Sequence, residues 1–166
     1  MTATLLVVHH SPTASVKSIT EAVLAGTRDE SIEGVEVVVR QALEATADDV
    51  LAADAYLLGT PANFGYMSGA LKHFFDSTFL QIGGSLSSTG AADESSGGTS
   101  GRPFGLYVHG RYDTEGAVRS VLSIVSALKW RQSAEVLEVV GDVTDRHREA
   151  AYDLGGTLSA LAATDT

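Results

Sequence analysis

The sequence predicts an α/β fold in which helices cover both faces of a parallel sheet. Short, continuous apolar runs alternate along the chain with segments whose apolar residues recur at helical spacing. Continuous apolar runs are typical of parallel strands that are buried on both faces. Alternation of strands and helices implies right-handed crossovers between parallel strands. With 166 residues, 44% of them hydrophobic, we expect a single domain over residues 1–166.

The first half of the chain contains three predicted strands and one clear helix. Thr4–Val8 is an apolar run that predicts a buried strand, and helical spacing follows from Val16 to about Arg28. Val35–Arg40 carries charges among its valines, which suits a strand at the edge of a sheet. Ala55–Gly59 is uncharged and predicts a third, buried strand, which leads into a turn-rich loop at 60–65.

The second half continues the alternation. Leu71–Ile82 and Val118–Leu128 carry apolar residues at helical spacing, and Phe104–Val108 between them predicts the fourth strand. Glu135–Val140 predicts a fifth strand that is charged enough for the opposite edge. A terminal helix begins with a mixed-charge run at Asp145 and continues with leucines at helical spacing.

One segment interrupts this alternation. Residues 83–101 are dominated by Gly, Ser and Thr, and they include Asp93 and Glu94 but no basic residue. Such a composition is typical of a mobile functional flap or a disordered linker. Because strand and helix patterns resume after it, we expect a flexible insertion within the domain, with a surface loop of no function as the simpler alternative.

Composition excludes several classes of function. The absence of cysteine excludes a disulfide scaffold, a thiolate zinc site and a cysteine nucleophile. With 11 basic and 21 acidic residues, the net charge of −10 repels phosphate backbones, so we expect no nucleic-acid partner. No apolar run approaches the roughly 20 residues of a membrane span, and the first ten residues lack the features of a signal peptide. We therefore expect a cytoplasmic protein that does not bind membranes.

Three loops are the places to look for a ligand. In an open α/β sheet, ligands bind beyond the carboxyl ends of the strands, where the strand order reverses. For five strands in the order 2-1-3-4-5, that reversal lies between the first and third strands. The loops at this edge span residues 11–17, 60–65 and 109–116.

The first loop places three hydroxyl groups between a buried strand and the start of a helix. Ser11, Thr13 and Ser15, with the backbone N–H groups of the helix start, are suited to hold a phosphate. Ordinary helix capping by Thr13 or Ser15 is the alternative. Neither the Walker pattern nor a Gly-x-Gly-x-x-Gly fingerprint occurs here, which disfavours a nucleotide triphosphate or dinucleotide site.

These residues also carry a family resemblance. Ser11-x-Thr13-x-Ser15, the stretch Gly59–Asp76 and a Gly-containing third loop together resemble the flavodoxin-like superfamily, a three-layer α/β sandwich. The chain is most similar to the NAD(P)H-dependent FMN and quinone reductases, including those of the tryptophan-repressor-binding-protein type. Ala14 stands where that family often has Gly, and Val16 where it often has Thr, so the ring contact is the firmer expectation.

The resemblance implies a non-covalent FMN whose phosphate lies on the first loop and whose ring lies between the second and third loops. It also implies NAD(P)H as electron donor, a quinone, a flavin or a redox partner protein as acceptor, and a homodimer. No catalytic side chain is expected, because the flavin supplies the redox chemistry. The candidate cofactor-binding residues are Ser11, Thr13, Ala14, Ser15, Val16, Thr60, Pro61, Ala62, Asn63, Phe64, Gly65, His109, Gly110 and Tyr112.

Several alternatives stay open. Tyr112 lies where flavodoxins often place a second ring, which favours a one-electron carrier, and a binding module without cofactor is a further possibility. Phe64 contacts the flavin ring or else packs beneath its loop. His9, His10 and His109 end adjacent strands, but without a carboxylate at suggestive spacing we expect hydrogen bonding and no metal. A serine hydrolase is disfavoured because no Gly-x-Ser-x-Gly elbow follows a strand.

Overall fold

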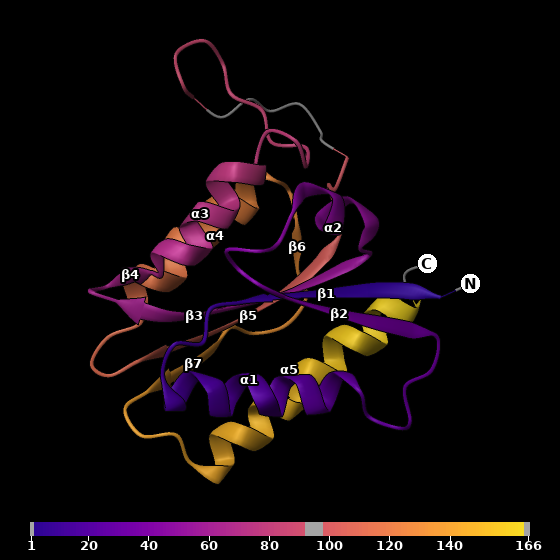
Figure 1. Ribbon diagram of the computed structural model, residues 1–166, viewed down its shortest axis with the longest axis vertical. Coiled ribbons are helices and arrows are strands. Elements are labelled where there is room, and N and C mark those ends of the chain that lie inside the picture. Colours follow the sequence, from indigo (N-terminus) through magenta and orange to yellow (C-terminus); the bar gives the residue numbers. More distant parts are fainter. Residues whose placement is uncertain (1, 92–97, 165–166) are drawn as a thin grey trace.

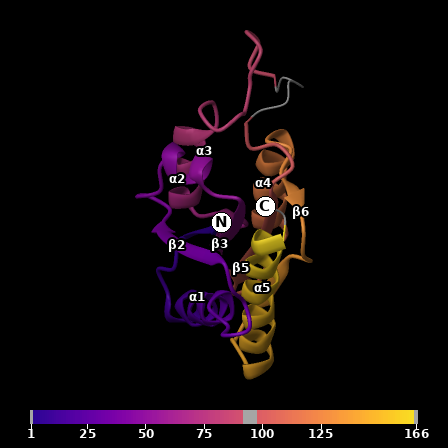
Figure 2. The ribbon, with the colours of Figure 1, turned by 90° about the vertical axis from the view of Figure 1, so that its right-hand side faces the viewer.

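Parallel strands form the middle of three layers in the computed structural model, which describes residues 2–91 and 98–164. The strands are β1 (Ala3–His9), β2 (Val35–Gln41), β3 (Ala55–Asn63), β4 (Tyr66–Met67), β5 (Pro103–Gly110), β6 (Arg131–Gln132) and β7 (Leu137–Val140). The helices are α1 (Ala14–Thr27), α2 (Ala47–Ala52), α3 (Gly69–Thr78), α4 (Glu115–Ala127) and α5 (Asp145–Thr164). Helices α2, α3 and α4 lie on one face of the sheet, and α1 and α5 lie on the other (Figures 1 and 2).

The strand order confirms the predicted topology. The sheet runs β2-β1-β3-β5, and β6 and β7 both pair with β5 at its outer edge. All of these pairs are parallel, so β5 and β7 are the fourth and fifth strands of the predicted 2-1-3-4-5 order. The expected strand at 135–140 begins later, at Leu137, and β6 pairs separately with the first two residues of β5.

The buried strands supply a core on each side of the sheet. Leu6 and Val8 of β1 belong to the cluster that α3 and α4 cover, whereas Leu5 and Val7 belong to the cluster under α1 and α5. Side chains of a strand alternate between the two faces, so a strand covered on both sides needs an uninterrupted apolar run. This is why the apolar runs of the sequence identified the strands.

Helix α2 and the hairpin that β4 forms with β3 were not predicted. Helix α2 has only six residues and is delimited by a capping box, in which Thr46 and Asp49 exchange hydrogen bonds. Strand β4 is a two-residue strand that pairs with Ala62 and Asn63. As a result, β3 extends through most of the segment 60–65 that we expected to be a loop, and the turn is confined to Phe64 and Gly65.

At the amino ends of β3 and β5, the buried Tyr56 and Trp130 form a cluster with the half-buried Arg102. The rings of Tyr56 and Trp130 stack at 4.0 Å. Arg102 Nη1 donates to the carbonyl oxygens of Val50, at 3.2 Å, and Ala53, at 2.7 Å, at the end of α2, and also to Tyr56 Oη. A cation at the last carbonyls of a helix is favourable because those groups lack partners within the helix. We call these three residues the amino-end cluster.

The same cluster anchors the ends of the insertion. Thr99 Oγ1 donates to the carbonyl oxygen of Ile82 at 2.6 Å and accepts from Trp130 Nε1 at 2.8 Å. Residues 83–91 project from the sandwich beyond the end of α3 (Figure 1). The expected flexibility of 83–101 concerns in part residues 92–97, which lie outside the described residues.

Candidate functional site

The β1–α1 loop leads into a well-capped helix start. Thr13 is the N-cap of α1, and its hydroxyl oxygen accepts from the backbone N–H of Val16 at 3.3 Å. Val16 is fully buried and its N–H is engaged by Thr13, so Val16 itself offers no exposed group to a ligand. Thr13 and Ala14 are exposed and Ser15 is half-buried. The first N–H groups of a helix have no partner within it, and those of Ala14 and Ser15 are therefore the donors suited to an anion.

Ser11 has a different environment from the one its position predicted. Its hydroxyl lies 2.8 Å from His9 Nδ1 and 2.8 Å from Thr20 Oγ1. Thr20 Oγ1 in turn lies 2.8 Å from the hydroxyl of Tyr107, which is completely buried on β5. A hydrogen-bonded chain thus runs from the loop into the core, and we refer to Tyr107, Thr20, Ser11 and His9 as the hydroxyl chain.

Burial determines the protonation behaviour along this chain. Burial raises the pKa of Tyr107 well above its usual range, so its phenol stays protonated. Burial and the neighbouring His10 lower the pKa of His9, and burial also lowers the pKa of His10. His10 Nδ1 is buried and has no hydrogen-bond partner among the described residues. The loop therefore carries an orphaned nitrogen beside the helix start.

The hairpin formed by β3 and β4 presents an aromatic ring to solvent. Phe64 is fully exposed and Tyr66 is 44% exposed, whereas Thr60 and Pro61 are buried. Thr60 Oγ1 accepts from the N–H of Ser68 at 2.9 Å and so fixes the base of the hairpin. Burial of Phe64 beneath its loop, the alternative that we left open, is wrong. Of the candidates in this segment, Asn63, Phe64 and Gly65 are exposed.

The turn itself has an unusual residue in it. Phe64 has φ 52° and Gly65 has φ 75°, and a two-residue hairpin with positive φ at both central positions has the signature of a type I′ turn. Asn-Gly is the favoured pair for such a turn, because a bulky residue rarely adopts positive φ. A phenylalanine held in this conformation with its ring in solvent suggests a function for the ring and not for the turn.

The β5–α4 loop lies against this hairpin. A Cβ on Gly116, in the first turn of α4, would stand 1.8 Å from the carbonyl oxygen of Gly65, so the two loops touch through their backbones. Tyr112 is 90% exposed in this loop. His109 and Gly110, by contrast, belong to β5 and are buried, and His109 Nε2 donates to the carbonyl oxygen of Gly141 at 2.8 Å. This bond engages Nε2 with the backbone, and the role of His109 at the flavin edge stays a prediction.

The carboxyl edge of the sheet therefore combines two exposed aromatic rings with the start of α1, where free backbone N–H groups can bind a phosphate. Register places the ends of β1, β3 and β5 side by side, with His9 opposite Gly59 and Pro61 opposite His109. Phe64 and Tyr112 offer apolar surface to a planar ligand, and the start of α1 offers N–H and hydroxyl groups to an anion. These residues fit an FMN. Among the described residues, no group of three or more His, Asp or Glu side chains fits a metal ion.

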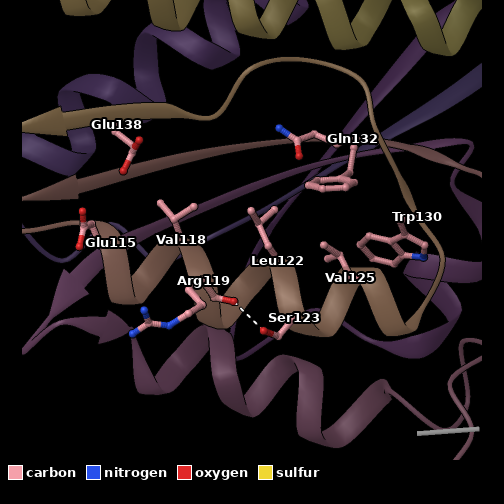
Figure 3. A pocket seen from close by; sticks show the side chains of 11 residues that line it. Glu115, Val118, Arg119, Leu122, Ser123, Val125, Trp130, Gln132 and Glu138 are labelled. Carbon is pink, nitrogen blue, oxygen red and sulfur yellow. Dashed lines mark hydrogen bonds between the residues drawn. The ribbon is translucent and has the colours of Figure 1, made fainter.

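A groove of about 680 Å³ lies elsewhere, between α4 and the edge of the sheet formed by β6 and β7 (Figure 3). Val118, Leu122 and Val125 of α4 turn toward it, with Trp130 near one end and Glu115 near the other. Phe104 of β5 also lines the groove, and in the described part of the chain β6 and β7 leave the middle of β5 without a neighbouring strand on this side. Apart from Glu115, its lining residues lie outside the three loops described above.

Comparison with known proteins identifies the family of this chain. The model of the family described as NADPH-dependent FMN reductase matches residues 14–140. The chain belongs to this family. The matched segment includes the start of α1, the β3–β4 hairpin and the β5–α4 loop. None of the helices in the described part of the chain is long and apolar enough to cross a membrane.

Curated relatives include both carriers and enzymes. A protein named flavodoxin from Aquifex aeolicus is 39% identical over 98 residues, which cover 58% of this chain and 52% of that protein. An NAD(P)H dehydrogenase (quinone) from Geobacter sulfurreducens is 31% identical over 107 residues, covering 49% of this chain and 52% of that protein. The chain thus spans about half the length of the curated relatives it matches.

Solved structures confirm the flavodoxin-like fold. A flavodoxin from the domain Archaea has a TM-score of 0.76 at 17% identity, with 96% of this chain and 98% of that chain covered. A flavodoxin, WrbA-like protein from Agrobacterium tumefaciens has a TM-score of 0.70 at 15% identity, with 97% and 98% covered. At these identities the likeness concerns the fold.

Proposed function

We propose that this member of the NADPH-dependent FMN reductase family binds FMN at the carboxyl edge of its sheet and accepts electrons from NADH or NADPH to reduce a small quinone or flavin. The observation that carries the proposal is the exposed Phe64 in a left-handed turn, beside the exposed Tyr112 and the start of α1. When bound, FMN supplies the hydride and electron-transfer chemistry itself. Residues 1–166 act in this proposal as one domain.

The start of α1 would hold the phosphate. The backbone N–H groups of Ala14 and Ser15 donate to it, helped by the hydroxyl of Ser15 and by the positive end of the helix dipole. Thr13 keeps its capping bond to Val16 and offers its own hydroxyl hydrogen to the anion. No cationic side chain is needed, which is consistent with the acidic balance of the chain.

The two touching loops would hold the ring. Phe64 covers one side of it, while backbone groups of Asn63 and Gly65 lie next to its polar edge. Tyr112 borders the other side. A nicotinamide must stack within roughly 3–3.5 Å of the flavin to react, so in this proposal Tyr112 lines the substrate pocket and leaves one ring face open.

A one-electron carrier is the second candidate. It is favoured by the relative named flavodoxin and by the exposure of Tyr112, which is free to cover the second ring face. The two functions differ in whether a nicotinamide reaches the flavin. A binding module without cofactor is the third possibility.

Two measurements separate these functions. Titration of the purified protein with FMN, followed by flavin fluorescence, should show saturable binding, and failure to bind would leave only the binding module. Anaerobic stopped-flow with NADH and with NADPH should then bleach the flavin absorbance directly. A flavoprotein that dithionite reduces, but that neither nicotinamide bleaches within minutes, would be a carrier.

We also propose a homodimer in the cytoplasm. Symmetric pairs are the commonest assembly of soluble proteins, and the exposed Phe64, Tyr66 and Tyr112 give the carboxyl edge an apolar surface that a second copy can cover. Analytical ultracentrifugation with and without FMN tests the assembly. A monomer in both states would contradict the dimer without affecting the assignment of the cofactor.

A further inference from the structure

The buried end of the hydroxyl chain determines which group donates and which accepts in each of its hydrogen bonds. Tyr107 is completely buried, and among the described residues Thr20 Oγ1 is the hydrogen-bond partner of its hydroxyl. A buried O–H hydrogen without an acceptor is costly, so Tyr107 donates to Thr20. Thr20 then donates to Ser11, and Ser11 donates to His9 Nδ1. His9 is thereby held neutral, with its proton on Nε2.

This direction changes what Ser11 can offer an anion. While His9 is neutral, the single hydroxyl hydrogen of Ser11 is directed to Nδ1 and is not available to a phosphate. A proton on His9 Nδ1 reverses that bond, and Ser11 then accepts from both His9 and Thr20. Its own hydrogen is then free to point to an acceptor outside the chain. Because Ser11 is half-buried in a surface loop, this hydrogen points to solvent until an anion takes the place of water.

We propose that the hydroxyl chain couples binding of the FMN phosphate to uptake of a proton by His9, with Tyr107 and Thr20 as positioning residues. The inference rests on the proposed FMN site. A phosphate oxygen beside Ser11 is a charged acceptor that binds this hydrogen more strongly than water does, so phosphate binding favours the imidazolium. By linkage, a proton on His9 must then strengthen phosphate binding by the same factor.

The surroundings of His9 contain few other groups that could produce this coupling. In the register of the sheet, His9 lies between Gln41 of β2 and Gly59 of β3, neither of which titrates. On β2, the neighbouring Arg40 is paired with Asp49. His10 follows in the chain and disfavours charge on His9.

The helices on the same face as His9 carry charges that are engaged or exposed. On α1, Lys17 and Glu21 are exposed. On α5, Arg148 donates to Ser18 of α1 and also pairs with Asp145. The hydroxyl chain therefore remains the direct route from the phosphate site to the imidazole.

The test measures the pKa of His9 by NMR of the imidazole signals, assigned with the His9→Asn variant. Saturating FMN should raise this pKa by about one unit, equivalent to a tenfold linkage. Saturating riboflavin, which has the same ring but no phosphate, should leave it unchanged. A pKa that FMN does not move, in a protein that binds FMN by fluorescence titration, would overturn the coupling and leave the proposed function intact. Failure to bind FMN would overturn both.

Two matched variants test the role of the chain. Tyr107→Phe removes the buried donor, so Thr20 can turn its hydrogen elsewhere and accept from Ser11. The pKa of His9 should then be higher than in the wild type before any ligand is added, and the shift caused by FMN should be smaller. Tyr56→Phe removes an equally buried phenol on the other face of the sheet and should change neither value. Identical behaviour of the two variants would show that Tyr107 does not position Ser11.

Discussion

At the amino ends of β3 and β5, the rings of Tyr56 and Trp130 are buried and stack at 4.0 Å, whereas at the carboxyl ends Phe64 is fully exposed and Tyr112 is 90% exposed. The buried pair also satisfies its polar atoms, because Tyr56 Oη donates to the carbonyl oxygen of Val50 and Trp130 Nε1 to Thr99. The exposed rings have no comparable packing. Aromatic residues at one end of the sheet therefore stabilise the fold, and those at the other end are available to a ligand.

The titratable groups at the two ends of the sheet also differ in their pKa shifts. At the amino end, burial raises the pKa of Tyr56 to about 12 even though the Arg102 guanidinium next to it acts in the opposite direction. Near the carboxyl end, burial lowers the pKa of His9 and His10. Tyr56 stays in one protonation state across the physiological range. A histidine, in contrast, can change its protonation state near physiological pH and can therefore respond to a bound anion.

The largest expected effect comes from truncating the buried ring. Trp130→Ala removes the stack on Tyr56 and the hydrogen bond to Thr99, and we expect it to lower the free energy of unfolding by about 3–5 kcal/mol. Trp130→Phe, which retains a ring, should cost far less. Chemical denaturation measures both. If FMN still binds the Ala variant with wild-type affinity under native conditions, the two ends are independent, and a large loss of affinity would contradict this separation.

Arg102 provides the next test of the amino end. Its guanidinium donates to several carbonyl oxygens around the end of α2, so Arg102→Ala leaves those acceptors without their partner. We expect a loss of about 2–3 kcal/mol in the free energy of unfolding. Arg102→Lys keeps the charge but not the fork of donors, and it should recover only part of this loss. Full recovery by lysine would mean that charge at the helix end, and not the hydrogen bonds, is what matters.

A charged substitution at Thr13 tests the proposed phosphate site at the carboxyl end of the sheet. Thr13→Asp keeps a good N-cap, so the free energy of unfolding should change little, but it places a carboxylate at the proposed phosphate site. Repulsion and the lost donor should weaken FMN binding at least about tenfold, or 1.4 kcal/mol. Thr13→Asn has similar size and capping ability without charge and serves as the control. Equal FMN affinity in the Asp variant and the wild type would place the phosphate elsewhere.

Much of the fold was predictable because burial on both faces leaves a clear pattern in the sequence. The runs Thr4–Val8, Ala55–Gly59 and Phe104–Val108 each became a central strand, since only uninterrupted apolar sequence satisfies both faces. Strand β4 left no such pattern, because two residues are too few for any periodicity. Helix α2 did leave a signal, the capping pair Thr46 and Asp49, that we did not use.

The candidate site was predictable as a set of loops but not as a set of contacts. Topology alone brings the ends of β1, β3 and β5 to one edge, and hence the first, second and third loops together. The hydroxyl chain was not predictable, because beyond Ser11 it continues from Thr20 to Tyr107, and these two residues are 87 positions apart and meet only across α1 and β5. Likewise, nothing in the sequence indicates that His109 is bound to Gly141.

The smallest expected effect, and the sharpest distinction between the two ends, comes from Phe64→Asn. Asparagine before Gly65 is the favoured type I′ pair, so relief of the left-handed phenylalanine should raise the free energy of unfolding by about 0.5–1 kcal/mol. Loss of the ring should at the same time weaken FMN binding several-fold, since an aromatic contact is worth about 0.5–1.5 kcal/mol beyond its buried area. Phe64→Tyr keeps the ring and should leave FMN affinity near the wild-type value. Opposite signs for stability and affinity in the Asn variant would show that Phe64 is retained for binding against the preference of its turn. An Asn variant that is more stable and binds FMN equally well would remove the ring from the site and leave Tyr112 as the remaining aromatic candidate.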